Sequence, residues 1–304
     1  MKKKINRRKA LKDMAIGTGA VALGGAALGA ESCAAGTEEA TAEKVNQSKG
    51  LKNNIKHSVC RWCYNGIELE TLAEKAKDMG IQSVEIIGPD DWKVIAKYDL
   101  TCAMGNAPFI SLTKGFNHTE YHEAYQKNYP GLIEQAADMG IKNIICFSGN
   151  REGISEEEGM ENCAKGLDSI VKHAEKHNVN IVMELLNSKV NHKDYQCDKT
   201  PWGAALVDKI GSPNFKLLYD IYHMQIMEGD VIATIRKYHE YFAHYHTGGV
   251  PGRNEINETQ ELYYPAIIQA IIDTGYDGYL GQEFIPKGED PLASLEEGVR
   301  ICDV

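Results

Sequence analysis

The sequence predicts an α/β protein of the (β/α)8 class, a TIM barrel, formed as a single domain over residues 55–304. Three observations lead to this expectation. Short β-type runs alternate with longer amphipathic helical runs, eight such units fit into about 250 residues, and no Gly-x-Gly-x-x-Gly or P-loop opens the first helix. Strict alternation favours a parallel sheet, and eight units favour a closed barrel over a doubly wound open sheet.

The expected elements follow from hydrophobic spacing. The strands are expected at 57–63, 83–87, 100–104, 143–147, 180–185, 215–219, 242–246 and 279–284. The helices are expected at 69–79, 129–139, 158–177, 202–210, 230–239 and 264–274. Several helices run into a glycine just before the next strand, as at Gly80, Gly140 and Gly275, where a positive φ closes the helix.

The composition, net charge and cysteine count exclude several classes of protein. The chain has 304 residues, of which 43% are hydrophobic and 25% charged, which is typical of a globular protein. The formal net charge of −10 argues against a protein that reads nucleic-acid phosphates through a basic face. Eight cysteines are too few for a scaffold built from disulfides.

The first residues are typical of an export signal. Residues 1–33 join a basic start to a Gly- and Ala-rich apolar run, and Asn6–Lys12 resembles a twin-arginine motif. We therefore expect passage through the twin-arginine export machinery, a polar linker over 34–54 and an exported, periplasmic location. Cys33 is a candidate for a lipid anchor that would tether the protein to the membrane, although Ala30 stands where a lipobox usually has leucine.

Cys60 and Cys63 form a Cys-x-x-Cys pair within the first expected strand. No second pair follows at zinc spacing. We interpret them as two strand cysteines rather than as a redox or zinc site.

Four consecutive expected strands, the fifth to the eighth, end in Glu184, Asp220, His246 and Glu283. The spacings of 36, 26 and 37 residues each correspond to about one βα unit. In a barrel of this class the chemistry lies at the carboxyl ends of the strands, so the four side chains share one mouth. Three neighbouring carboxylates would repel each other unless a cation lay between them. Two Glu, one Asp and one His suit Mn²⁺ or Mg²⁺, with zinc or cobalt left open.

These strand ends carry a family resemblance. The segments 184–189, 219–225, 244–253 and 278–283, together with 229–236, resemble hydroxypyruvate isomerase and, more broadly, the xylose-isomerase-like sugar isomerases and epimerases. The resemblance covers roughly residues 55–300 and implies a (β/α)8 fold, a divalent metal, and proton transfer between adjacent carbons of a hydroxy-carbonyl compound.

The resemblance also implies roles for single residues. Glu184, Asp220, His246 and Glu283 become the metal ligands. His246 departs from the Gln that is frequent in close hydroxypyruvate isomerases and follows the ketose-epimerase pattern. His223 is expected to contact substrate oxygens, with the orientation of a carboxylate as the alternative.

Position alone suggests further roles around the mouth. Glu184 and Glu283 are the expected catalytic pair, one removing the carbon-bound proton and the other returning it or protonating oxygen. Arg253, in the loop after the seventh expected strand, is a candidate clamp for a substrate carboxylate or hydroxyl. Asn187 and Lys189 are weaker candidates for substrate binding.

The function predicted is interconversion of a small hydroxy-aldehyde and hydroxy-ketone through an enediolate. The alternatives are a ketose 3-epimerase, a metal-dependent hydrolase or lyase of sugar derivatives, and a non-catalytic sugar-binding module. The excess of acidic over basic residues and the small number of histidines at strand ends argue against a nuclease. The expected partner is a small keto or aldo acid or a sugar rather than nucleic acid, and a homo-oligomer is left open.

Overall fold

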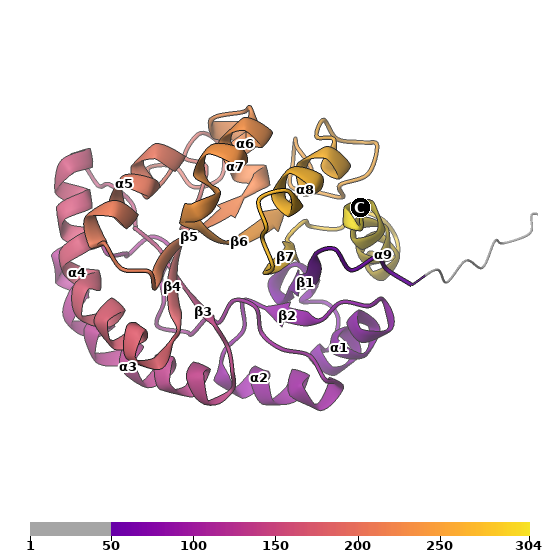
Figure 1. The fold of residues 1–304 in the computed structure, drawn as a ribbon, viewed down its shortest axis with the longest axis horizontal. Helices are drawn as coiled ribbons and strands as arrows, with labels where there is room; N and C mark the ends of the chain where they lie inside the picture. The colour runs from indigo at the N-terminus through magenta and orange to yellow at the C-terminus, as the bar shows by residue number, and fades with distance from the viewer. Residues whose placement is uncertain (1–49) are drawn as a thin grey trace, which may run out of the picture. The chain divides into compact units, whose positions relative to one another are not determined.

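The computed structural model describes residues 50–304, which form a curled parallel sheet surrounded by helices (Figure 1). The strands are β1 (Lys56–Cys60), β2 (Ser83–Glu85), β3 (Asn143–Cys146), β4 (Asn180–Leu185), β5 (Phe215–Asp220), β6 (Phe242–Thr247) and β7 (Tyr279–Gln282). They pair in the order β2-β1-β7-β6-β5-β4-β3, and every pair is parallel. The expected α/β barrel class is therefore confirmed.

The strand expected at 100–104 differs from the prediction. This segment forms only isolated parallel bridges, Thr101 to Ser83 on β2 and Gly105 to Ile87 and Ile144, and these bridges connect the two edges of the sheet. Side chains replace part of the ladder, because Ala103 N–H donates to Ser83 Oγ and the Ala103 carbonyl accepts from Asn143 Nδ2. The segment therefore occupies the place of a strand without a continuous ladder.

The helices lie outside the sheet (Figure 1). They are α1 (Leu69–Asp78), α2 (Pro89–Ile95), α3 (His122–Asp138), α4 (Glu156–His177), α5 (Thr200–Ile210), α6 (Ile221–Met227), α7 (Val231–Tyr238), α8 (Tyr264–Ile272) and α9 (Pro291–Cys302). The sequence did not indicate α2, α6 or α9, and α3 begins at His122 rather than at Tyr129. Both α2 and α6 are only seven residues long, which is too short for a clear helical period.

Two apolar clusters fill the fold. The larger lies between the sheet and the helices, and the smaller consists of Met104, Ile145, Val182 and Leu218. Val182 and Leu218 lie two residues before Glu184 and Asp220, so they share the inward face of their strands. The small cluster therefore forms an apolar floor below the strand ends.

The expected export signal (1–33), most of the linker (34–54) and Cys33 lie outside the described residues, and these expectations stay predictions. Within residues 50–304, none of the helices combines the length and the apolar character that crossing a bilayer requires.

Candidate metal and active site

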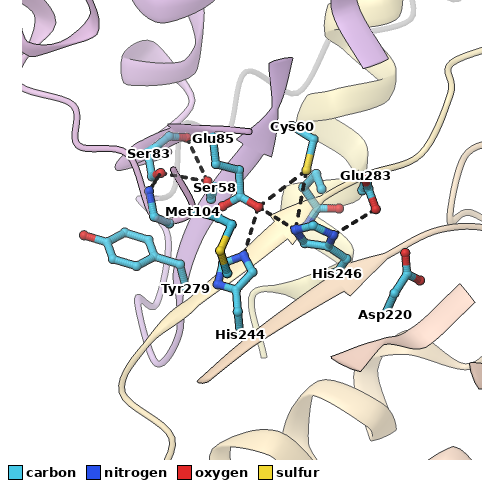
Figure 2. Close-up of polar contacts among 12 residues, drawn as sticks. Ser58, Cys60, Ser83, Glu85, Met104, Asp220, His244, His246, Tyr279 and Glu283 are labelled. Atoms are coloured by element: carbon cyan, nitrogen blue, oxygen red, sulfur yellow. Dashed lines mark hydrogen bonds and ion pairs between the residues drawn. The ribbon is translucent and has the colours of Figure 1, made fainter. Parts of the chain in front are cut away.

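The sheet register brings the four predicted ligands together. Glu184 lies near the end of β4, Asp220 ends β5, His246 lies near the end of β6 and Glu283 follows β7 directly. Asp220 is aligned with His246, and His246 with Gly281. One ligand atom from each of the four side chains lies within 4.8 Å of the other three, and all four residues are buried. Figure 2 shows Asp220, His246 and Glu283 converging on this point.

The hydrogen bonds of His246 test whether a cation fits. Its Nε2 lies 2.6 Å from Oε1 of Glu85, and its Nδ1 lies 2.8 Å from Oε2 of Glu283 and 3.5 Å from Oε1 of Glu184. An ionised carboxylate only accepts hydrogen bonds, so Nε2 carries a hydrogen. When the ring gives up its Nδ1 proton, the Nδ1 lone pair faces these carboxylate oxygens. Such a set of buried acceptors needs positive charge among them, and two Glu, one Asp and one His form a donor set that fits a divalent metal.

Arg253 also reaches this cluster. Its Nη2 donates to Oδ2 of Asp220 at 3.1 Å and to Oε2 of Glu283, and its guanidinium lies over the rings of Trp62 and Tyr222. Only 8% of Arg253 is exposed. The arginine predicted to clamp the substrate is therefore inside the mouth, where it offsets part of the carboxylate charge.

The surroundings of the three carboxylates push their pKa values in different directions. Burial raises the pKa of Glu184, and the nearby charge of Glu283 adds to the effect. Burial also raises the pKa of Asp220 well above its usual value, against the influence of Arg253. Burial would raise the pKa of Glu283 as well, but the charges of Arg253 and His246 hold it well below its usual range. The site thus contains carboxylates of unequal basicity side by side.

Asn187 and His223 lie beside the cluster. The backbone N–H of Asn187 donates to Nδ1 of His223 at 3.2 Å, and its side-chain Nδ2 lies 2.6 Å from the same atom. The hydrogen of the neutral ring is therefore on Nε2, which lies 3.6 Å from Oδ2 of Asp220 and has no hydrogen-bond partner within residues 50–304. Burial lowers the pKa of His223 well below its ordinary value. His223 thus presents an N–H donor beside the four-residue cluster, and Asn187 orients it rather than facing the cluster itself.

Lys189 is placed elsewhere. Its Nζ donates to the carbonyl oxygens of Ile226 and Met227, at the C-terminal end of α6. The prediction that Lys189 binds substrate finds no support in this placement, because the ammonium group satisfies helix-end carbonyls instead.

Sequence reasoning missed two groups in the site. Trp62 was not among the candidate site residues, yet its Nε1 donates to Oε1 of Glu283 at 2.7 Å. Glu85, at the end of β2, accepts from both His244 and His246. A carboxylate inside the apolar run Val84–Ile87 was a signal that could have identified it.

Cys60 and Cys63 were expected to lie in one strand, but only Cys60 does. Cys60 ends β1, whereas Cys63 lies in the short 3-10 helix η1 (Arg61–Tyr64), and both are free thiols. Cys60 Sγ lies 3.4 Å from Oε1 of Glu85, so it borders the site without forming a disulfide.

Comparison with known proteins agrees with this architecture. The family model for the xylose isomerase-like TIM barrel matches residues 73–303, and the chain belongs to that family. A putative hydroxypyruvate isomerase of Homo sapiens is 35% identical over 108 residues, a match that covers 36% of this chain and 39% of the relative. The hydroxypyruvate isomerase of Escherichia coli K12 is 27% identical over 244 residues, covering 76% of this chain and 91% of the relative.

Solved structures share the fold. A family 2 AP endonuclease from Brucella melitensis superposes with a TM-score of 0.70 at 22% identity, covering 81% of this chain and 97% of that one. A D-psicose 3-epimerase from Clostridium cellulolyticum H10 superposes with a TM-score of 0.67 at 18% identity, covering 82% of this chain and 100% of that one. At these identities the likeness concerns the fold alone.

Proposed function

We propose that this protein is a metal-dependent isomerase that interconverts a hydroxy-aldehyde and a hydroxy-ketone by moving a proton between adjacent carbons. One observation carries the proposal: four buried ligand atoms, from Glu184, Asp220, His246 and Glu283, converge within 4.8 Å at the carboxyl ends of neighbouring strands. The names of the relatives support the same reaction class, since both curated relatives described above are named as hydroxypyruvate isomerases.

Mn²⁺ or Mg²⁺ is the proposed ion, and when bound it would stabilise the negative charge that develops on the substrate oxygens. Glu184 and Glu283 come from the outer two of four consecutive strands, β4 and β7, at opposite ends of the ligand row. In the proposed reaction one of them removes the proton from carbon, and the other delivers a proton to the neighbouring carbon or oxygen.

Two further side chains hold the substrate in this proposal. His223 donates its Nε2–H to a substrate oxygen, in the orientation that Asn187 imposes. Arg253 shifts part of its contact from Asp220 and Glu283 to the substrate and closes one wall with Trp62. Both donors are buried, so each hydrogen bond forms where little water competes.

A neighbouring cleft favours a second candidate, the ketose 3-epimerase. A cleft of about 540 Å³ lies next to the site and is lined by residues that include Trp62, Arg61, Asp90, Asp91 and Asn106. This space exceeds what a three-carbon acid needs, and its two aspartates outnumber its one arginine, Arg61, so its charge does not favour an anionic substrate. Return of the proton to the opposite face of the same carbon would then give epimerisation of a sugar.

Isotope exchange tests the proposal and separates its two forms. The protein with Mn²⁺ is incubated in deuterated water with hydroxypyruvate, a four-carbon keto acid and a panel of ketoses. Deuterium entering a carbon next to the carbonyl supports the isomerase class, and the labelled product identifies isomerisation or epimerisation. Absence of exchange with every compound would contradict both forms.

A further inference from the structure

The inner face of the barrel is divided into an apolar and a polar half. Met104, Ile145, Val182 and Leu218 fill one side, as is usual for this fold. The other side holds six buried polar or thiol residues (Figure 2). Glu85 bonds Cys60, His244 and His246, and beside them Ser58 and Ser83 bond each other. All six residues are fully buried. Burying a carboxylate and two imidazoles there is costly, and none of the proton-transfer steps above uses Glu85 or His244.

Three donors converge on a single oxygen of Glu85. Its Oε1 accepts from His246 Nε2 at 2.6 Å, from His244 Nε2 at 2.9 Å and from the Cys60 thiol at 3.4 Å. Glu85 is therefore the acceptor that these three donors share at the back of the His246 ring.

The neighbouring strand β7 leaves room for this contact. Gly281 on β7 is aligned with His246, and a Cβ atom there would overlap Oε1 of Glu85 and lie 2.7 Å from Cδ2 of His246. A side chain of any size at position 281 would push the carboxylate and the imidazole apart. The glycine thus maintains the spacing that the Glu85–His246 hydrogen bond needs.

We propose that Glu85 is a positioning residue for the metal site: it holds His246 in the orientation and the tautomer that present Nδ1 to the cation. The proposal rests on the proposed metal site. It assigns Glu85 no contact with substrate. Because Glu85 takes the Nε2 hydrogen, Nδ1 is the ring atom that faces Glu184 and Glu283.

Metal affinity provides the first test. Mn²⁺ is titrated into metal-free wild-type protein and into the Glu85→Gln and Glu85→Leu variants, with binding followed calorimetrically. Loss of the carboxylate is expected to weaken binding about 10- to 100-fold, with Leu worse than Gln, because Gln retains an acceptor oxygen. Ser83→Ala is the matched control, since Ser83 is buried on the same strand but bonds to Ser58 and not to His246. We choose Mn²⁺ because the partly exposed group of Glu134, His173 and His177 offers zinc a second set of ligands.

Gly281→Ala tests the same contact without removing a ligand or Glu85. The added methyl group is expected to weaken Mn²⁺ binding at least tenfold, while thermal unfolding reports whether the barrel stays folded.

A double-mutant cycle then distinguishes positioning of His246 from general damage to the fold. In a His246→Gln background, Glu85→Leu should change Mn²⁺ affinity less than twofold, because the residue through which Glu85 acts is gone.

Nuclear magnetic resonance of protein labelled with ¹⁵N in histidine gives a readout that needs no metal. We expect His246 Nε2 to carry a hydrogen that exchanges slowly in the wild type and rapidly in Glu85→Leu. An Nε2 without hydrogen in the wild type, Mn²⁺ binding unchanged in Glu85→Leu, or no Mn²⁺ binding by the wild type would each overturn the proposal. Failure of isotope exchange with Mn²⁺ binding intact would instead count against the proposed function alone.

Discussion

Asn187 holds His223 through two hydrogen-bond donors, because both its backbone N–H and its side-chain amide face Nδ1 of the imidazole, at 3.2 and 2.6 Å. Asn191 Oδ1 in turn accepts from the same amide at 2.8 Å. The ring is therefore fixed with its Nε2 hydrogen available to the substrate.

Removal of the amide by Asn187→Ala should loosen His223 and reduce the rate of isotope exchange about tenfold, the effect of losing roughly 1–2 kcal/mol of buried hydrogen bonding. Steady-state exchange with an active substrate measures this rate. Lys189→Met is the control in the same loop, because Lys189 bonds the end of α6, and its exchange rate should change less than twofold. If Lys189→Met lost as much activity as Asn187→Ala, the division of roles in this loop would be wrong.

Glu283→Gln and Glu184→Gln should each slow isotope exchange by about 10²- to 10⁴-fold, the usual contribution of a positioned acid or base. Gln keeps the shape of the side chain and one oxygen, so Mn²⁺ content is measured in the same samples. Loss of exchange with the metal retained assigns the defect to proton transfer. Exchange at the wild-type rate in either variant would exclude that glutamate as a base.

Replacing each of two glycines on packed helices by alanine should change the free energy of unfolding in opposite directions. A Cβ at Gly166 on α4 would lie 2.5–2.8 Å from the imidazole of His122 on α3, whereas nothing lies within 4 Å of a Cβ at Gly131 on α3. We expect Gly166→Ala to lower the free energy of unfolding by roughly 1–3 kcal/mol through overpacking. Gly131→Ala should raise it by up to about 1 kcal/mol because alanine favours the helix. Urea unfolding measures both, and a stabilised Gly166→Ala would refute the packing of α3 on α4.

His57 should make stability depend on pH. It lies on β1, fully buried, and neither ring nitrogen has a hydrogen-bond partner among residues 50–304. Burial lowers its pKa to about 4, only partly opposed by Asp303. The unfolded chain, with a pKa near 6.5, therefore binds the proton more tightly, and the folded protein loses up to roughly 1.4 kcal/mol per pH unit as pH falls from about 6.5 to 4.

His57→Leu should remove that contribution, so its free energy of unfolding should fall less steeply than that of the wild type across the same window. Urea unfolding at several pH values between 4 and 7 gives both curves. Parallel curves would show that His57 does not titrate as its burial implies.

Much of the candidate site could be predicted because the proposed ligands follow strand ends at a regular spacing in the sequence. Asp220 and Glu283 follow apolar strands at regular intervals, and the barrel rule places such ends at one mouth. Glu85 was not predicted because its strand was expected to continue to Ile87. The strand ends at Glu85 instead, and Ile86 takes a φ of 58°, an uncommon conformation for a β-branched residue.

Other differences from the predictions arose where tertiary contacts decide the placement. The segment 100–104 has the composition of a strand, yet side chains of Ser83 and Asn143 take the backbone groups of Ala103 that a ladder would use. Lys189 reads as a substrate ligand by position, but α6, which the sequence did not indicate, supplies carbonyls for its ammonium group. Local sequence patterns indicate neither the side chains that bond Ala103 nor the helix-end carbonyls that bond Lys189.

The proposed chemistry depends most directly on one cation held by Glu184, Asp220, His246 and Glu283. The decisive measurement is the Mn²⁺ stoichiometry of metal-free protein, followed by electron paramagnetic resonance during titration, for the wild type and for a Glu184→Gln/Asp220→Asn double variant. We expect one tightly bound ion per wild-type chain and loss of that ion in the folded double variant. A wild type that binds no Mn²⁺, or a double variant that binds it as tightly as the wild type, would contradict the account.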